Sequence, residues 1–445
     1  MSLISLLANS AVGAKAEELT GRLFLQIAVI LCVTQMVVRL SRRFLGQTDV
    51  AGEILAGIVL GPSLFGALMP SVSARLFHAS TSPIFVGLAQ LALVLLMFQI
   101  GMEFRFGASL GSSKRTVTVI SVTGILFPFV LGYCAAPWFH AAMAEPRPSL
   151  LGFRLFFATA MSITAIPILG RIFMELGLSH TRTAALTIGA AALDDICGWL
   201  LLGAISAIVT ANFSLSNLSV RLFALVAFVW FVFGVIGKPL ARFIVAQIRR
   251  SGSLTADILA LILVVLLTAA MITSHIGVFA IIGGFIIGVA FHEEREIGEE
   301  WTRRVSPLVN TLLLPLFFTY TGLRTDIGTL SNKTAWLQCA LVCSIAFIGK
   351  LGGAYVAARA CGEAHRQALT IGVCMNTRAL LEHIALNIGY DLGVLPRQMY
   401  TMLVIMALVS TYMATPLIRW LMAGERRPVH QPAGRPDSTY LRDVG

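Results

Sequence analysis

The sequence predicts an all-α polytopic membrane protein of about thirteen transmembrane helices. Of its 445 residues, 57% are hydrophobic and only 12% are charged, and the mean hydropathy is +0.84. Soluble globular proteins are about 25% charged. Apolar runs of roughly 17 to 25 residues, enough to cross a bilayer as a helix, recur along the chain. Lys and Arg gather in alternate connections between these runs, as they do in membrane proteins.

Thirteen apolar runs account for most of the chain. The second and ninth runs are short and rich in glycine, so eleven or twelve spans remain an alternative. In order, the runs lie near 23–40, 51–69, 83–102, 116–138, 153–174, 184–209, 219–245, 254–273, 276–291, 305–323, 335–358, 367–390 and 400–422.

The Lys and Arg residues orient these spans. An odd number of spans places the two termini on opposite sides, and an outside N-terminus assigns most of the basic residues to cytoplasmic connections. We therefore expect a multi-pass protein of the bacterial inner membrane with its N-terminus outside and its C-terminus in the cytoplasm. The same asymmetry explains the net charge of +11, which then gives no indication of nucleic-acid binding.

The order of the spans predicts two inverted repeats within a single membrane domain, 1–445. Six spans, a linker span and six more give two halves of opposite orientation, because an offset of seven spans reverses direction. A short similarity between "GMEFRFG" at 101–107 and "TGLRTDIG" at 321–328 falls at matching positions. The predicted parts are an outer tail 1–22, a first repeat 23–209, a linker helix 219–245, a second repeat 254–422 and a disordered cytoplasmic tail 423–445.

The fifth and twelfth spans correspond in this scheme, and both contain residues that interrupt helices. Pro167 in "MSITAIPILGR" removes a backbone hydrogen bond, and Ser162 and Thr164 can satisfy groups freed nearby. Polar or irregular backbone is tolerated in a bilayer only where protein or water surrounds it, and paired discontinuous helices mark the binding sites of transporters. The polar residues of the twelfth span are Asn376, Thr377, Arg378, Glu382, His383 and Asn387.

Two adjacent carboxylates, Asp194 and Asp195, lie in the apolar run "AALDDICGWLL". A carboxylate at the bilayer centre costs at least about 2.5 kcal/mol on insertion scales, so it indicates a functional site. Neighbouring helical positions diverge by about 100°, so the two side chains are expected to have different roles. A cation, a proton or both must accompany them.

Only two basic residues remain deep in the apolar spans, Lys350 and Arg378. Arg378 has Glu382 four residues later, within reach on a helix, which indicates a structural pair. Lys350 is therefore the expected charge partner of one aspartate.

The residues at this point resemble the monovalent cation/proton antiporters, in the branch of bacterial sodium/proton and potassium/proton exchangers and plant cation/proton exchangers. The similar segments follow the order of the family from the second span to the loop before the thirteenth. They are "GEILAGIVLGPSLFG" (52–66), "SITAIPILGRIFMELGL" (162–178), "AALDDICGWLLL" (191–202), "LLPLFFTYTGLRTDI" (313–327), "GKLGGA" (349–354) and "MNTRALLEHIALNIGYDLGVL" (375–395).

The resemblance implies the sodium/proton antiporter fold, with a dimerisation domain, a mobile core and crossed discontinuous helices, and it favours a homodimer. Asp195 matches the acid that alternately binds the cation and the proton, and Asp194 matches the acid that pairs with Lys350. Ser162 and Thr164 lie where the fifth span could supply oxygens to a hard cation. The implied function is exchange of Na⁺ or K⁺ for protons, with no cofactor.

The twelfth span departs from the family pattern. Family members commonly have glycine and an aliphatic residue where this chain has Ala379 and His383, and Arg105 stands where an acid is common. These differences leave the choice of ion open. His383 is either a pH sensor or a hydrogen-bonded core histidine.

Other readings of the sequence differ in class. A potassium efflux channel regulated by a separate subunit is one, and a non-transporting sensor on the same scaffold is another. The acidic run in "FHEEREIGEEWTRR" (291–304) is either a solvated face or a funnel that attracts cations. No nucleophile with a base, phosphate loop or metal constellation indicates an enzyme, and the seven cysteines form no CxxC motif.

Overall fold

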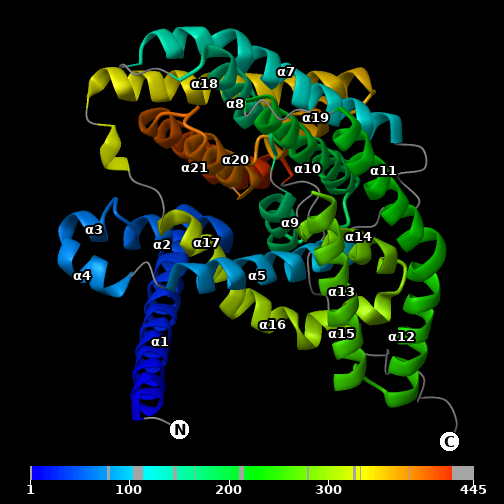
Figure 1. The fold of residues 1–445 in the computed structure, drawn as a ribbon. Helices are drawn as coiled ribbons and strands as arrows, with labels where there is room; N and C mark the ends of the chain where they lie inside the picture. The colour runs from blue at the N-terminus through cyan, green and yellow to red at the C-terminus, as the bar shows by residue number, and fades with distance from the viewer. Residues whose placement is uncertain are drawn as a thin grey trace, which may run out of the picture.

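The computed structural model describes residues 3–77, 81–103, 114–143, 148–164, 166–209, 215–277, 280–323, 327–330, 332–378 and 380–422. Over these residues the chain is helical with no strand (Figure 1). Within the described ranges, ten helices are long and apolar enough to cross a membrane, and two further apolar helices are shorter, Ala280–Phe291 and Ser306–Tyr320. The all-α membrane fold predicted from the sequence is confirmed.

The helices pack into two bundles. The first bundle joins α1, α2 and α5 to α11–α17, and its closest pairs are α5 with α14 and α2 with α17. Its helices are α1 Leu3–Leu45, α2 Asp49–Leu60, α3 Phe65–Leu68, α4 Pro70–Leu76, α5 Ser82–Glu103, α11 Leu215–Phe231, η2 Val232–Ile236, α12 Gly237–Ser251, α13 Ala256–Ile276, α14 Ala280–Phe291, α15 Arg295–Arg304, α16 Ser306–Leu308, η3 Val309–Leu313 and α17 Leu314–Leu323.

The second bundle is built around α7 and α18, which run across the top of Figure 1 above α8, α10, α19, α20 and α21. The short helix η4, Ile327–Thr329, connects α17 to this bundle and contacts α21. The members of the second bundle are α7 Lys114–Ala141, α8 Leu150–Ser162, α9 Ile166–Glu175, α10 Arg182–Val209, α18 Lys333–Ala360, α19 His365–Met375, α20 Leu380–Asp391 and α21 Arg397–Leu421.

Each bundle draws on both halves of the sequence. The first contains the first three spans of either half, and the second contains the last three. The inverted symmetry itself stays a prediction. The bundles meet chiefly where α9 contacts α2 and α5, and α9 lies near the centre of Figure 1.

Some element boundaries differ from the predicted ones. Helix α1 begins at Leu3, well before the predicted span at 23, and the linker span contains a π-helical segment, η2, between α11 and α12. A hydrophobicity window detects neither the early start of α1 nor the π-helical segment. A helix can continue beyond its apolar run, and π-turns depend on packing. Arg105, Ala379 and the tail 423–445 lie outside the described residues.

Glycines allow α5 and α14 to touch backbone to backbone. A Cβ placed on Gly288 would stand 2.3 Å from the carbonyl oxygen of Phe98, and one on Gly101 would stand 2.6 Å from that of Phe285. Small residues permit such close crossings in membrane bundles, where van der Waals contact contributes to helix association. The glycine shared by the two predicted repeat segments, Gly101, therefore has a packing role.

We expect Gly288→Val to destabilise the first bundle by about 1–3 kcal/mol or more, because the added side chain would push α5 away. Thermal unfolding of purified protein in detergent measures the loss. Gly87→Val is the matched control, since Gly87 is exposed on α5 and its Cβ would meet nothing within 4 Å. Equal melting temperatures for the two variants would contradict the packing argument.

Candidate functional site

The fifth span is broken into α8 and α9. Helix α8 begins with Ser149, whose hydroxyl accepts from the N–H of Gly152, and ends at Ser162, after which Ile163 is extended with φ −76° and ψ 141°. Pro167 explains the position of the break, because a proline ring clashes with the carbonyl four residues earlier, here that of Ile163. Pro167 itself lies in the first turn of α9, where its missing N–H costs nothing.

The twelfth span is broken into α19 and α20 at Asn376–Arg378, and the two breaks touch. The hydroxyl oxygen of Thr164 lies 3.1 Å from the carbonyl oxygen of Met375, the last residue of α19. Thr411 of α21 supports the second break, since its hydroxyl donates to the carbonyl of Arg378 and accepts from the N–H of the same residue. Irregular backbone at this depth is therefore enclosed by protein, as a membrane requires.

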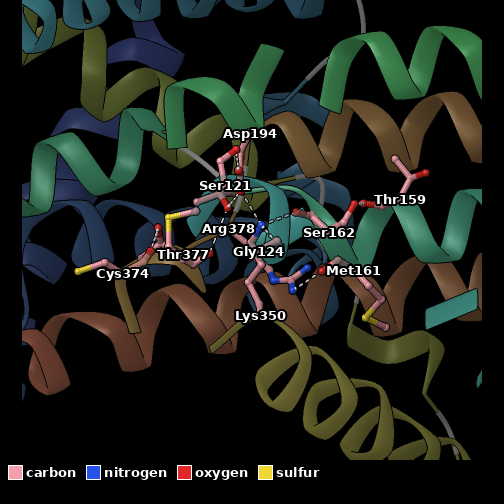
Figure 2. A network of polar contacts seen from close by, with 12 residues as sticks. Ser121, Gly124, Thr159, Met161, Ser162, Asp194, Lys350, Cys374, Thr377 and Arg378 are labelled. Atoms are coloured by element: carbon pink, nitrogen blue, oxygen red, sulfur yellow. Dashed lines mark hydrogen bonds and ion pairs between the residues drawn. The ribbon is translucent and has the colours of Figure 1, made fainter. Parts of the chain in front are cut away.

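Asp194 is fully buried and fully partnered. Its Oδ1 accepts from the hydroxyl of Ser121 at 2.6 Å, and its Oδ2 lies 2.7 Å from Lys350 Nζ and 2.8 Å from Thr164 Oγ1 (Figure 2). These contacts come from α7, α18 and the break in the fifth span. They neutralise the charge of Asp194 and leave little capacity for a further ligand.

Asp195 is equally buried, but neither of its carboxylate oxygens has a hydrogen-bond partner among the residues that the structure describes. The N-terminus of α9 faces it, with the backbone N–H of Ile166 directed at the carboxyl without reaching hydrogen-bond geometry. A helix N-terminus carries partial positive charge, which favours an anion there. Asp195 is therefore the carboxylate with both oxygens available to a proton or a cation.

Lys350 neutralises more than one group. Its ammonium donates to Asp194 Oδ2, to the carbonyl of Gly124 at 2.8 Å and to the carbonyl of Ser162 at 2.5 Å. Ser162 ends α8, so Lys350 also satisfies one carbonyl at the negative end of that helix. All three donors of the ammonium are used, and Figure 2 shows the amino group among these oxygens.

Arg378 completes the termination of α8. Its Nη1 donates to the carbonyl of Ala160 and its Nη2 to that of Met161, both at 2.7 Å. Glu382, the partner expected from sequence, lies 3.8 Å from Nη1, and its oxygens accept no hydrogen bond from any described residue. The guanidinium is thus committed chiefly to backbone, because residue 378 falls in the interruption rather than on a regular helix.

The remaining residues predicted for the site differ in what their side chains contact. The hydroxyl of Ser162 donates to the carbonyl of Thr159. The backbone carbonyl of Ser162, rather than its hydroxyl, therefore accepts from Lys350. Thr377 donates to the carbonyl of Cys374, whereas Asn376 Oδ1 is buried without a partner. The side chain of His383 lies outside the part of the chain that the structure describes.

Ser121 and Gly124 of the fourth span belong to the site but were not predicted from the sequence. Both are common residue types in packed membrane helices, so nothing in "VISVTGIL" separates them from their neighbours. Their spacing of three residues places them on one face of α7. That face contacts the site only because α7 packs on α10 and α18.

A cavity of about 1050 Å³ opens between the bundles near α15. Glu103 of α5, Arg182 of α10 and Glu299 of α15 are among its lining residues, and neither Asp194 nor Asp195 reaches it. The acidic segment thus divides: Glu293, Glu294 and Glu299 line the cavity, whereas Glu296 pairs with Arg249. The N–H of Leu254, then Arg303 and Arg304, hold the pKa of Glu300 below its usual value.

Comparisons with known proteins agree on one family. The protein-family model described as "sodium/hydrogen exchanger, transmembrane" matches residues 27–424. The chain is 36% identical over 393 residues to the Na⁺/H⁺ antiporter NhaS4 of Synechocystis, covering 88% of this chain and 95% of that protein. It is 34% identical to the cation/H⁺ antiporter 17 of Arabidopsis thaliana, covering 90% of this chain.

More distant proteins also match most of the chain. The K⁺/H⁺ antiporter 1 of Saccharomyces cerevisiae is 28% identical, covering 92% of this chain. This chain spans about half the length of the plant and yeast relatives, 48% of each. The sodium proton antiporter MjNhaP1 of Methanocaldococcus jannaschii has a similar fold, with a TM-score of 0.61 at 15% identity, covering 91% of this chain and 98% of that one.

We expect Arg378→Lys to lower the free energy of unfolding by about 1–3 kcal/mol, the cost of leaving a buried carbonyl unsatisfied. A single ammonium lacks the planar fork that places donors on Ala160 and Met161 together. Chemical or thermal unfolding in detergent provides the measurement. Arg250→Lys, on the exposed end of α12, serves as the control and is expected to change stability by less than about 0.5 kcal/mol.

Proposed function

Because the chain belongs to the sodium/hydrogen exchanger family, we propose that it exchanges a monovalent cation, Na⁺ or K⁺, for protons across a membrane. Relatives named as Na⁺/H⁺, K⁺/H⁺ and cation/H⁺ antiporters support this function. The family consists of transporters rather than enzymes. The observation that carries the proposal is Asp195, a fully buried carboxylate beside two helix breaks with both oxygens unpartnered.

Competition for Asp195 would couple the two ions. An isolated ionised carboxylate is costly in an apolar interior, so Asp195 is stable there only with a proton or a bound cation. A protonated carboxyl has lost the charge that attracts the metal ion, and a carboxylate that holds the metal ion leaves no room for the proton. Asp194 cannot substitute for Asp195, because Lys350 already neutralises it.

Transport also requires that the site reach each side in turn. The cavity beside α15 is lined by residues of both bundles, so relative movement of the bundles would change it. We propose that the second bundle, which contains Asp195, is the mobile core and that the first bundle is the fixed part through which two copies dimerise. With the N-terminus outside, the cavity faces the cytoplasm of a bacterial cell.

The two alternative functions, a regulated channel and a non-transporting sensor, predict a different environment for Asp195. A channel regulated by a separate subunit would need a continuous path, whereas Asp195 is enclosed in the described structure. A non-transporting sensor would need no ion-binding carboxylate, and a buried charge without a structural partner is expensive to keep. The intact pair of Asp194 and Lys350 beside the free Asp195 favours exchange over both.

We expect Asp195→Asn to reduce cation-driven proton flux to the level of protein-free liposomes, because the amide takes up no proton and carries no charge for the cation. The assay uses proteoliposomes with an internal pH dye, to which Na⁺, K⁺ or Li⁺ is added in turn. Asp257→Asn, at an exposed position on α13, should keep the parent's rate. Full activity of Asp195→Asn would refute the mechanism.

We expect Lys350→Ala to retain part of the flux but to change its dependence on voltage. If Lys350 and Asp194 exchange protons during the cycle, each turnover moves net charge, worth about 2.3 kcal/mol per charge per 100 mV. Flux is compared at clamped potentials set by a potassium gradient and valinomycin, with Na⁺ or Li⁺ as the transported ion. Lys333→Ala, at the exposed start of α18, is the control. An unchanged voltage dependence would show that Lys350 takes no part in charge movement.

A further inference from the structure

A buried ion pair joins the two bundles at α9. The Nη2 of Arg171 on α9 lies 3.4 Å from Glu53 Oε1 on α2, and the two side chains are only 6% and 4% exposed. The Nε of Arg171 also donates to Glu175 at 2.7 Å, and Glu175 in turn accepts from the backbone N–H of Asp49 at 2.7 Å. Two connections therefore run from α9 to the start of α2.

Glu53 is firmly attached to the first bundle. Its backbone carbonyl accepts from the hydroxyl of Thr319 on α17 at 3.2 Å, and Thr319 lies 2.9 Å from the hydroxyl oxygen of Thr34 on α1. The Glu53 side chain thus projects from a fixed three-helix contact towards α9. A force on Arg171 is transmitted to α1 and α17 as well as to α2.

The surface of α9 next to Arg171 is shaped for the same contact. A Cβ on Gly170 would stand 2.4 Å from Ile100 Cδ1 and 2.8 Å from Ile100 Cγ1 of α5, so a larger residue there requires Ile100 to move or α9 to shift away. Helix α9 has ten residues and spans about 15 Å. Arg171 lies near the middle of this helix and the N-terminus of the same helix faces Asp195, so a contact that holds Arg171 also holds that N-terminus.

The Glu53–Arg171 pair is imperfect in a way that suits a contact made and broken repeatedly. Glu53 Oε2 and Arg171 Nη1 are both buried with no hydrogen-bond partner in the described part of the chain. A paired Arg fork would normally satisfy two oxygens at about 2.7–2.9 Å, and unsatisfied buried groups offset part of the attraction. The contact holds α9 in place without making its release prohibitive.

We propose that Glu53 and Arg171 form a clamp between the bundles that positions α9 against Asp195 and stabilises the conformation in which the cavity near α15 is open. Glu53 is thus a positioning residue for ion exchange although it lies in the opposite bundle from the carboxylate it affects. The clamp opens when the second bundle moves to expose Asp195 on the other side. This inference rests on the proposed exchange function for its place in the cycle.

The test measures conformation directly. In a variant whose seven cysteines are replaced, Met102→Cys places one thiol on the wall of the cavity, where the native side chain is 9% exposed. A membrane-impermeant maleimide then reports how often the cavity is open. We expect Glu53→Gln to slow labelling by about threefold or more, because loss of the clamp shifts the population away from the open conformation.

A double-mutant cycle tests whether the Glu53 and Arg171 substitutions act through one shared contact or independently of each other. Arg171→Gln should also slow labelling, and the double variant should be no slower than the slower single variant, since both changes break one contact. Glu296→Gln is the matched control, because Glu296 pairs with Arg249 at 2.7 Å within the first bundle and should leave labelling unchanged. If Glu53→Gln does not fold, Glu53→Asp tests the same contact with a carboxylate one methylene further away.

A labelling rate of Glu53→Gln equal to or above that of the parent overturns the proposal, as does full additivity in the double variant. Labelling needs no transport. Absence of exchange by the parent in proteoliposomes would therefore refute the proposed function while leaving the clamp separately measurable.

Discussion

The end of α8 inside the membrane bundle is the constraint on which the site depends. Its last carbonyls point into a region where no further helical turn supplies N–H donors to them, and each unsatisfied group would cost several kcal/mol in an apolar interior. Lys350 and Arg378 supply the donors, from α18 and from the second interruption. Two cations so close together in turn require negative charge nearby, so Asp194 belongs to the same electrostatic unit as the helix end.

This arrangement gives the adjacent residues Asp194 and Asp195 different surroundings. Asp194 lies on the side of α10 that faces Lys350 and Ser121, and it is saturated by them. Asp195 is rotated about 100° away, towards the N-terminus of α9, and it has no such partners. Adjacent positions on one helix thus give one carboxylate that is paired with Lys350 and one that the described residues leave unpaired. The N-terminus of α9 moderates the cost of ionising Asp195 without occupying it.

The short helix α9 connects the proposed ion site to the bundle that does not contain it. It belongs to the second bundle by sequence, yet it contacts α2 and α5 of the first. Its N-terminus therefore faces Asp195 of the second bundle, whereas its charged C-terminal half contacts α2 of the first bundle. A displacement of one bundle against the other would act on α9, which makes the helix a physical link between the first bundle and Asp195.

Composition and apolar periodicity by themselves determined the membrane class, the helical fold and most of the spans, because burial in lipid imposes long apolar runs. The rarity of intramembrane charge singled out Asp194, Asp195, Lys350 and Arg378. The residue pattern left open which aspartate is paired, and the family resemblance assigned Asp194 to Lys350. Tertiary structure supplied the physical reason, since the partners Ser121, Thr164 and Lys350 reach Asp194 from segments distant in sequence. It also decided that Glu53 meets Arg171 across 118 positions of chain. A one-dimensional pattern records which residues are costly in a bilayer, whereas their pairing depends on how separate helices pack.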